Sequence, residues 1–263
     1  INPATGFVVA ILYWLTWTIA LGSEFTAAGL IMRNWFPHTP VWIWSLLFMI
    51  GIVISNIYSV RIFAESEFWL AIIKIVALIA FSIVGFLIIM GLIGQQGYIG
   101  SSIFLGSGGF APNGYWSIIL TMTIILVNFQ GTEIIGLAAG ECKNPEKSIP
   151  IAVRNVTWRI IALYIIPISI LISILPWDKA GLEDSVFAVA MSNYGLDRFA
   201  ALFAFVVLTA ALSCSNSGLY GTSRAMYSLA TLGMAPKKLA ELNKNGMPKN
   251  AVLVSIVSCW FII

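Results

Sequence analysis

The chain has 263 residues, of which 59% are hydrophobic and 10% charged, whereas soluble domains carry about 25% charged residues. This composition excludes an ordinary water-soluble domain and predicts an all-α integral membrane protein. The formal net charge of +3 comes without a block of basic residues, so no nucleic-acid partner is indicated.

Seven apolar segments, separated by polar connections, are expected to cross the membrane as helices. In chain order they are residues 6–32, 42–60, 68–93, 116–140, 155–175, 197–229 and 251–263. The chain starts beside the first segment and stops inside the seventh without a closing charge. We therefore expect a single transmembrane domain over residues 1–263 that is truncated at both ends.

Lysine and arginine residues gather in alternate connections. Residues 61–67, 141–154 and 230–250 contain one, three and four of them, while residues 94–115 contain none and are rich in glycine and serine. The positive-inside rule places the basic connections in the cytoplasm. The first segment is then expected to run outward.

The residue types needed for common enzymatic and metal chemistry are scarce. His38 is the only histidine, which excludes histidine triads and multi-histidine metal sites. Cys142, Cys214 and Cys259 lack the spacing of metal ligands. No pair of nucleophile and base is evident. The sequence therefore predicts no enzyme, no cofactor and no metal site.

Three ionisable residues lie well inside the apolar segments: Glu24, Lys74 and Glu133. Such a group costs about 2.5–3.5 kcal/mol near the membrane centre and usually faces a partner or a water-filled cavity. Glu24 lies among small residues and either faces a substrate path or is a hydrogen-bonded packing residue. Lys74 is either a buried amine that gains and loses a proton or a side chain that snorkels to the cytoplasmic interface.

A polar, glycine-containing interruption breaks the fourth segment. It contains Asn128, Phe129, Gly131 and Glu133. Broken membrane helices expose backbone groups, and in transporters these breaks hold substrate and ions. We expect a binding site here, and the alternative is a kink whose backbone groups are satisfied by neighbouring helices.

A second polar cluster lies in the sixth segment and includes Ser213, Asn216 and Ser217. Hydroxyl and amide groups in a membrane helix either line a pathway or bond to neighbouring helices as packing contacts. The residues alone favour neither role.

A series of short motifs runs along the chain. In order they are Glu67-Phe68-Trp69 with Ile73-Lys74, Phe129-Gln130-Gly131-Thr132-Glu133, Gly140-Glu141, Asn144-Pro145-Glu146-Lys147, Ile149-Pro150, Leu212-Ser213 with Asn216-Ser217, Ser223-Arg224, and Ala235-Pro236-Lys237. With these motifs the sequence resembles the amino-acid permeases of the amino acid–polyamine–organocation (APC) superfamily nearly end to end. The resemblance implies a LeuT-type fold of two five-helix inverted repeats.

The seven segments would then be helices three to nine of that fold. The first helix of the family, whose break receives the substrate carboxylate, would be absent together with the second helix and the end of the fold. We expect the fragment not to transport by itself.

The resemblance also implies roles for single residues. Carbonyl groups at Asn128, Phe129 and Gly131 would hold the substrate amino group, with Glu133 nearby. Lys74 matches a fifth-helix lysine that favours proton coupling in some members. Ser213, Asn216 and Ser217 would lie on the eighth helix close to that lysine. Glu24 would attract a cationic side chain or bind a proton.

The function that the resemblance implies is secondary active import of amino acids by proton symport, with alternating access around the broken sixth helix. Residues 22–32 and 217–220 look closest to lysine-type bacterial permeases, which favours a cationic substrate such as lysine. The alternatives are other neutral or aromatic amino acids, or a membrane amino-acid sensor on the same fold. The expected partners are an amino acid, protons and the lipid bilayer, in a multi-pass protein of the bacterial cell (inner) membrane.

Overall fold

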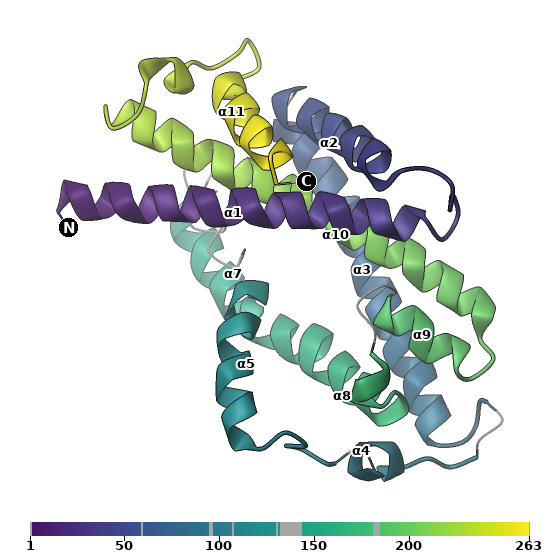
Figure 1. Cartoon of the computed structure of the whole chain (residues 1–263). Helices are drawn as coiled ribbons and strands as arrows, with labels where there is room; N and C mark the ends of the chain where they lie inside the picture. The colour runs from purple at the N-terminus through teal and green to yellow at the C-terminus, as the bar shows by residue number, and fades with distance from the viewer. Residues whose placement is uncertain are drawn as a thin grey trace. The chain divides into compact units, whose positions relative to one another are not determined.

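The structure is a computed structural model of the chain, and it describes residues 2–58, 60–94, 97–106, 108–129, 131, 144–180 and 185–262. The described residues form helices joined by turns and contain no strand (Figure 1). The chain divides into two compact units, Ile1–Ile72 with Leu208–Ile263, and Ile73–Val207. Helices α3 and α10 contribute residues to both units.

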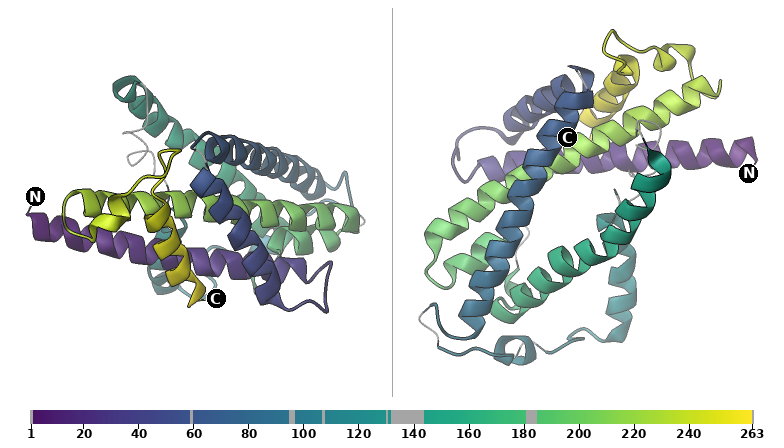
Figure 2. Two further views of the ribbon diagram at one scale, coloured as in Figure 1. Left: turned by 90° about the horizontal axis from the view of Figure 1, so that it is seen from above. Right: turned by 180° about the vertical axis from the view of Figure 1, so that it is seen from behind.

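The first unit is built on three helices that pack on one another, α1 (Pro3–Met32), α2 (Val41–Tyr58) and α11 (Lys249–Trp260) (Figure 2). The start of α3 (Val60–Ile89) and the later part of α10 (Asp197–Thr231) belong to the same unit. A short 3-10 helix, Lys237–Ala240, lies between α10 and α11.

Helix α1 begins where the sequence supplies both a cap and a proline. The Asn2 side chain accepts a hydrogen bond from the Ala4 backbone nitrogen at 3.1 Å, and Pro3 occupies the first helical position. Proline suits that position because its missing N–H would have no partner there. The connection from α1 to α2 contains Pro37 and Pro40, which prevent the helix from continuing.

Small residues in α1 and α10 let helices approach closely. A Cβ atom added at Gly29 would lie 2.7 Å from the Ser45 Oγ atom and 2.8 Å from the Val41 carbonyl oxygen. A Cβ atom added at Gly218 would lie 2.7 Å from a ring carbon of Trp17. The Ser45 hydroxyl also donates to the Phe25 carbonyl oxygen at 2.9 Å. Close packing of this kind is typical of membrane helices, which associate through small residues.

Helix α3 starts earlier than the hydropathy of the sequence indicates. Residues 61–67, interpreted above as a connection, lie inside the helix. The physical reason is that residues 60–89 contain no proline, and their one glycine, Gly85, lies near the end of the helix. Backbone hydrogen bonding therefore continues through the charged residues at the start.

The second unit contains the rest of α3 and α10 together with α4 (Ser102–Gly106), α5 (Tyr115–Asn128), α7 (Pro145–Ile160), α8 (Ile166–Ile174) and α9 (Val186–Ser192). The 3-10 helix Trp177–Lys179 follows α8. A π-helical turn, Ile161–Ile165, joins α7 to α8. Pro167 lies two residues after this turn, and its missing backbone N–H relaxes the regular helical bonding at this point.

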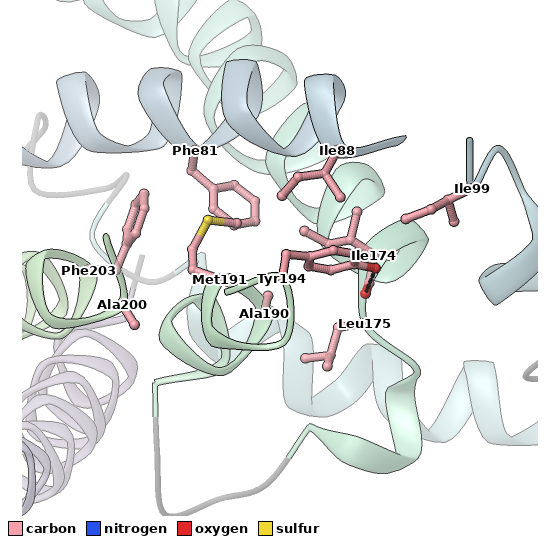
Figure 3. Close-up of a cluster of buried hydrophobic side chains, with 10 residues drawn as sticks. All are labelled: Phe81, Ile88, Ile99, Ile174, Leu175, Ala190, Met191, Tyr194, Ala200 and Phe203. Carbon is pink, nitrogen blue, oxygen red and sulfur yellow. Dashed lines mark hydrogen bonds between the residues drawn. The ribbon is translucent and has the colours of Figure 1, made fainter. Parts of the chain in front are cut away.

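A buried cluster of apolar side chains forms the core of the second unit (Figure 3). Phe81 from α3 packs edge-on against Phe203 from α10, with ring centroids 5.5 Å apart. The Tyr194 phenol donates a hydrogen bond to the Ile174 carbonyl oxygen at 2.9 Å. Burial raises the pKa of the Tyr194 phenol, which keeps the group protonated as a donor.

Five described helices are long and apolar enough to cross a membrane. They are Pro3–Met32, Val41–Tyr58, Phe63–Ile89, Glu146–Ile174 and Asp197–Thr231. The fourth begins well before residue 155, the start expected from hydropathy, because Asn144, Pro145 and Glu146 form a favourable helix start. Many large apolar side chains on these helices are exposed, as expected for surfaces that face lipid.

Candidate functional site

Two of the polar residues expected in α10 meet at an acid on α3. The Ser213 hydroxyl donates a hydrogen bond to the Glu67 Oε1 atom. The Asn216 Nδ2 atom donates to the Glu67 Oε2 atom at 3.3 Å. Ser213 and Asn216 are each 1% exposed, whereas Glu67 is half-buried. The carboxylate therefore receives one donor on each oxygen from a single face of α10.

The same network extends to α2 through a pair of amides. The Asn56 Nδ2 atom donates to the Asn216 Oδ1 atom at 2.9 Å and to the Ile52 carbonyl oxygen at 3.1 Å. Asn56 is fully buried, and its Oδ1 atom accepts no hydrogen bond from the described residues. The Asn216 Nδ2 atom also lies 3.5 Å from the Ser66 Oγ atom.

We call the five residues Asn56, Ser66, Glu67, Ser213 and Asn216 the Glu67 cluster. It joins three helices within the first unit. Ser213 and Asn216 are three residues apart on α10, a spacing that brings helical side chains to the same face. Ser217 is half-buried at the next position along α10.

Glu67 was not expected to be a functional residue. The hydropathy pattern placed it at the end of a cytoplasmic connection, one residue before the third apolar segment. The sequence contains one signal that could have identified Glu67: no helix breaker lies between Val60 and Phe68. Helix α3 therefore begins about two turns before the apolar segment and includes Glu67. Its partners Ser213 and Asn216 lie 146 and 149 residues further along the chain. Helical periodicity predicts which residues share a face of one helix, but not which residues of two distant helices meet.

A stack of one cation and two aromatic rings lies beside the Glu67 cluster. The Phe63 and Tyr220 rings are stacked with centroids 4.4 Å apart and an interplanar angle of 11°. The Arg224 Cζ atom lies 3.7 Å from the centroid of the Tyr220 ring. Phe63 precedes Glu67 by one helical turn and Tyr220 follows Asn216 by one turn, so α3 and α10 contact each other in antiparallel register.

The connection between α10 and α11 holds the end of α2. The Asn243 Nδ2 atom donates to the Ile57 carbonyl oxygen at 2.8 Å, and the Asn245 Nδ2 atom donates to the Tyr58 carbonyl oxygen at 2.5 Å. These bonds satisfy carbonyl groups that a helix end leaves without partners. The same connection carries Met247, whose Sδ atom lies 3.6 Å from the Arg224 Nη2 atom.

The helix break expected in the fourth segment coincides with the end of α5. The helix ends at Asn128, and Gly131 has a φ of +111°, a conformation that favours glycine. The half-buried Phe129 ring stacks on Tyr164 at a centroid distance of 5.6 Å. Tyr164 lies in the π-helical turn, so two irregular stretches of backbone meet at this pair of rings. Glu133 lies outside the described residues.

The two remaining candidates lie on different helices. Glu24 is half-buried on α1, beside the fully buried Phe25. Lys74 is half-buried on α3, in the part of that helix that belongs to the second unit. Its proximity to the α10 hydroxyls, implied by the family resemblance, stays a prediction.

Comparison with known proteins points to one family. The family model described as amino acid permease matches residues 1–263. The Bacillus subtilis (strain 168) amino-acid permease RocC is 41% identical over 259 residues, which are 97% of this chain and 55% of the relative. The gamma-aminobutyric acid permease of the same organism is 42% identical over 253 residues, or 96% and 54% of the two chains.

The lysine-specific permease LysP of Escherichia coli (strain K12) is 41% identical over 266 residues, which are 98% of this chain and 54% of the relative. The chain thus spans about half the length of the curated relatives it matches. These relatives are named as permeases, which confirms that the chain is related to transporters and not to enzymes.

Proposed function

Because the chain belongs to the amino acid permease family, we propose that the full-length protein imports amino acids across the cell membrane by secondary active transport. Its relatives are bacterial permeases, and five of its described helices are long and apolar enough to span a bilayer. The chain is therefore part of a multi-pass protein of the bacterial inner membrane. Proton symport and alternating access are the mechanism that we assign to it.

The observation that carries this proposal is the end of α5 in the middle of an apolar segment. The C-terminal end of a helix carries a partial negative charge, because its peptide dipoles are aligned. This arrangement suits the ammonium group of an amino acid. We assign substrate binding to the backbone at Asn128, Phe129 and Gly131, with Glu133 close to it in sequence.

The stack of Phe129 on Tyr164 supports a role for this stretch of chain in alternating access. It joins the end of α5 to the π-helical turn between α7 and α8. Neither stretch has regular α-helical bonding, so backbone rotation here breaks fewer hydrogen bonds than it does within a helix. Movement at this pair of rings would open the site to one side of the membrane and close it to the other.

For the substrate, we propose a cationic amino acid such as lysine. Glu24 supports this assignment because a half-buried carboxylate on a membrane helix attracts positive charge. In a cationic amino acid the side-chain ammonium group supplies that charge, in addition to the α-ammonium group. The relatives include a lysine-specific permease and a gamma-aminobutyric acid permease at nearly equal identity. Neutral and aromatic amino acids are therefore the alternatives that a competition assay has to include.

For the coupling ion, we propose the proton, with Lys74, Glu133, Ser213, Asn216 and Ser217 as the residues concerned. Ser213 and Asn216 support this assignment because both are buried and both donate hydrogen bonds to a carboxylate. A carboxylate within a membrane helix is a group that can gain and lose a proton during transport.

Counterflow separates a transporter from a sensor. The full-length protein is reconstituted into liposomes loaded with unlabelled lysine, and the entry of labelled lysine is measured against a panel of competing amino acids. We expect rapid exchange that unlabelled lysine blocks most strongly. Binding of labelled lysine without exchange would contradict transport and favour the sensor, whereas exchange blocked chiefly by another amino acid would contradict the lysine assignment alone.

A further inference from the structure

The Glu67 cluster places a carboxylate near the start of the apolar helix α3, where two side chains of α10 donate hydrogen bonds to its oxygens. Glu67 lies within Phe63–Ile89, one of the five stretches that could cross a membrane. We propose that Glu67 binds the proton that drives transport, and that Ser213 and Asn216 are positioning residues that hold it in both charge states. The inference rests on the proposed proton symport and adds a residue to it.

The hydrogen bonds around Glu67 suit the ionised carboxylate. Its two oxygens only accept hydrogen bonds, and Ser213 and Asn216 supply one donor to each of them. Hydrogen bonds to a charged group contribute more than neutral ones, and they offset part of the cost of placing a charge in the membrane.

The same partners also suit the protonated acid. A carboxylic acid has one O–H donor, and the Ser213 hydroxyl can accept it because a hydroxyl both donates and accepts. The Ser213 hydroxyl would then donate to the carbonyl oxygen four residues earlier, as Ser215 does to the Ala211 carbonyl oxygen at 2.9 Å. Asn216 keeps its bond to the other oxygen. Protonation therefore leaves neither the Glu67 oxygens nor the Ser213 hydroxyl without a partner.

Asn56 fixes the orientation of the Asn216 amide. Its Nδ2 atom donates to the Asn216 Oδ1 atom, so the Asn216 Nδ2 atom is the end that faces Glu67. Asn56 is itself held by the Ile52 carbonyl oxygen at 3.1 Å. Asn216 is thereby kept as a donor, which suits a carboxyl oxygen in either charge state.

Charged residues also lie on the helices that meet at the cluster. On α10, Arg224 follows Asn216 by about two turns and lies over the Tyr220 ring. On α3, Glu65 is exposed, Lys74 follows Glu67 by seven residues, and the Arg61 side chain lies outside the described part of the chain. On α2, Tyr58 is the titratable residue. The other four members of the Glu67 cluster have neutral side chains.

The proton balance of the step is simple. A proton from water on the outer side adds to a Glu67 carboxylate oxygen, and the same proton leaves to water on the cytoplasmic side. No other reactant is consumed.

The test compares two reactions of the full-length protein in liposomes. Gradient-driven accumulation of labelled lysine requires proton binding and release. Counterflow exchange requires only that the protein, with substrate and proton bound, changes the side of the membrane that its binding site faces. In Glu67→Gln, the amide mimics the protonated acid and cannot lose a proton. We expect this variant to keep counterflow, to lose accumulation above the equilibration level, and to lose the pH dependence of exchange.

Glu65→Gln is the matched control, because Glu65 is an exposed carboxylate two residues away on the same helix. We expect it to accumulate lysine as the wild type does. Glu67→Asp keeps a titratable group and is expected to retain part of the lysine accumulation that Glu67→Gln loses. Ser213→Ala keeps the carboxyl group and is expected to shift the pH at which exchange is half-maximal.

The outcomes separate this inference from the proposed function. Wild-type protein that fails to accumulate lysine in a proton gradient overturns proton symport itself. Wild-type accumulation together with normal accumulation by Glu67→Gln overturns the role of Glu67 alone. Loss of both reactions in Glu67→Gln, with no rescue in Glu67→Asp and an unshifted pH profile in Ser213→Ala, also overturns it, because the residue would then be structural.

Discussion

At the scale of single residues, some glycines lie where two helices touch and a larger side chain would collide, whereas others have open space beside them. Gly29 faces the Ser45 hydroxyl and the Val41 backbone so closely that an added methyl group would collide with both. Gly51, on α2, has no neighbour within 4 Å of an added Cβ atom. Both lie in helices, where alanine is otherwise preferred over glycine.

Replacement of Gly29 by alanine is expected to destabilise the protein by about 1–3 kcal/mol, the usual cost of inserting atoms into a closely packed contact. The midpoint of thermal unfolding of the detergent-solubilised full-length protein measures this effect. Gly51→Ala is the matched control and is expected to leave the midpoint unchanged or raise it. Equal midpoints for the two variants would show that the close contact between α1 and α2 does not contribute to stability.

At the scale of helices, α3 and α10 contact each other through two kinds of interaction. The Glu67 cluster supplies hydrogen bonds, and one turn away the Phe63 ring stacks on Tyr220 beneath the Arg224 guanidinium. Stacked aromatic pairs contribute about 0.5–1.5 kcal/mol beyond the area that they bury. The start of α3 is thus attached to α10 at successive turns.

A double-mutant cycle on Phe63→Ala and Tyr220→Ala is expected to give a coupling free energy of about 0.5–1.5 kcal/mol. Unfolding of the two single variants and of the double variant provides the four free energies. Phe68 is an exposed aromatic residue on the same helix, so the pair Phe68→Ala and Tyr220→Ala is the control, with coupling near zero. Additive effects for Phe63 and Tyr220 would contradict the contact.

The sequence indicated the polar face of α10 but not the acid that it contacts. Ser213 and Asn216 were evident because polar residues in an apolar segment need partners. Glu67 was missed because Arg61, Glu65 and Ser66 around it lower the local hydropathy and look like a loop. Helix α3 includes these residues because helix formation depends on backbone bonding, which charged side chains at a helix start do not prevent.

The end of α5 was easier to predict than its consequences. Asn128 and Gly131 marked a break because a polar residue and a glycine interrupt an apolar run. The contact of Phe129 with Tyr164 was not predictable, because it depends on a π-helical turn 32 residues after Phe129. Such turns arise from local adjustments of hydrogen bonding near Pro167 that hydrophobic periodicity does not reveal.

At the scale of the whole molecule, family membership fixes the class of protein more firmly than it fixes the substrate. The relatives named for lysine and for gamma-aminobutyric acid share 41% and 42% of their residues with this chain over the matched region. Specificity is a difference between binding free energies, and a small difference changes it strongly. The proposed mechanism, proton symport, does not depend on which of these amino acids the protein prefers.

The most direct test of that mechanism is to measure proton movement and amino-acid uptake together. The full-length protein is reconstituted into liposomes that contain a pH-sensitive dye, and lysine is added outside at equal internal and external pH. Symport predicts that the lumen becomes more acidic as labelled lysine enters, and that an inward proton gradient drives lysine above its external concentration. Lysine entry with an unchanged internal pH and no response to the gradient would contradict proton symport.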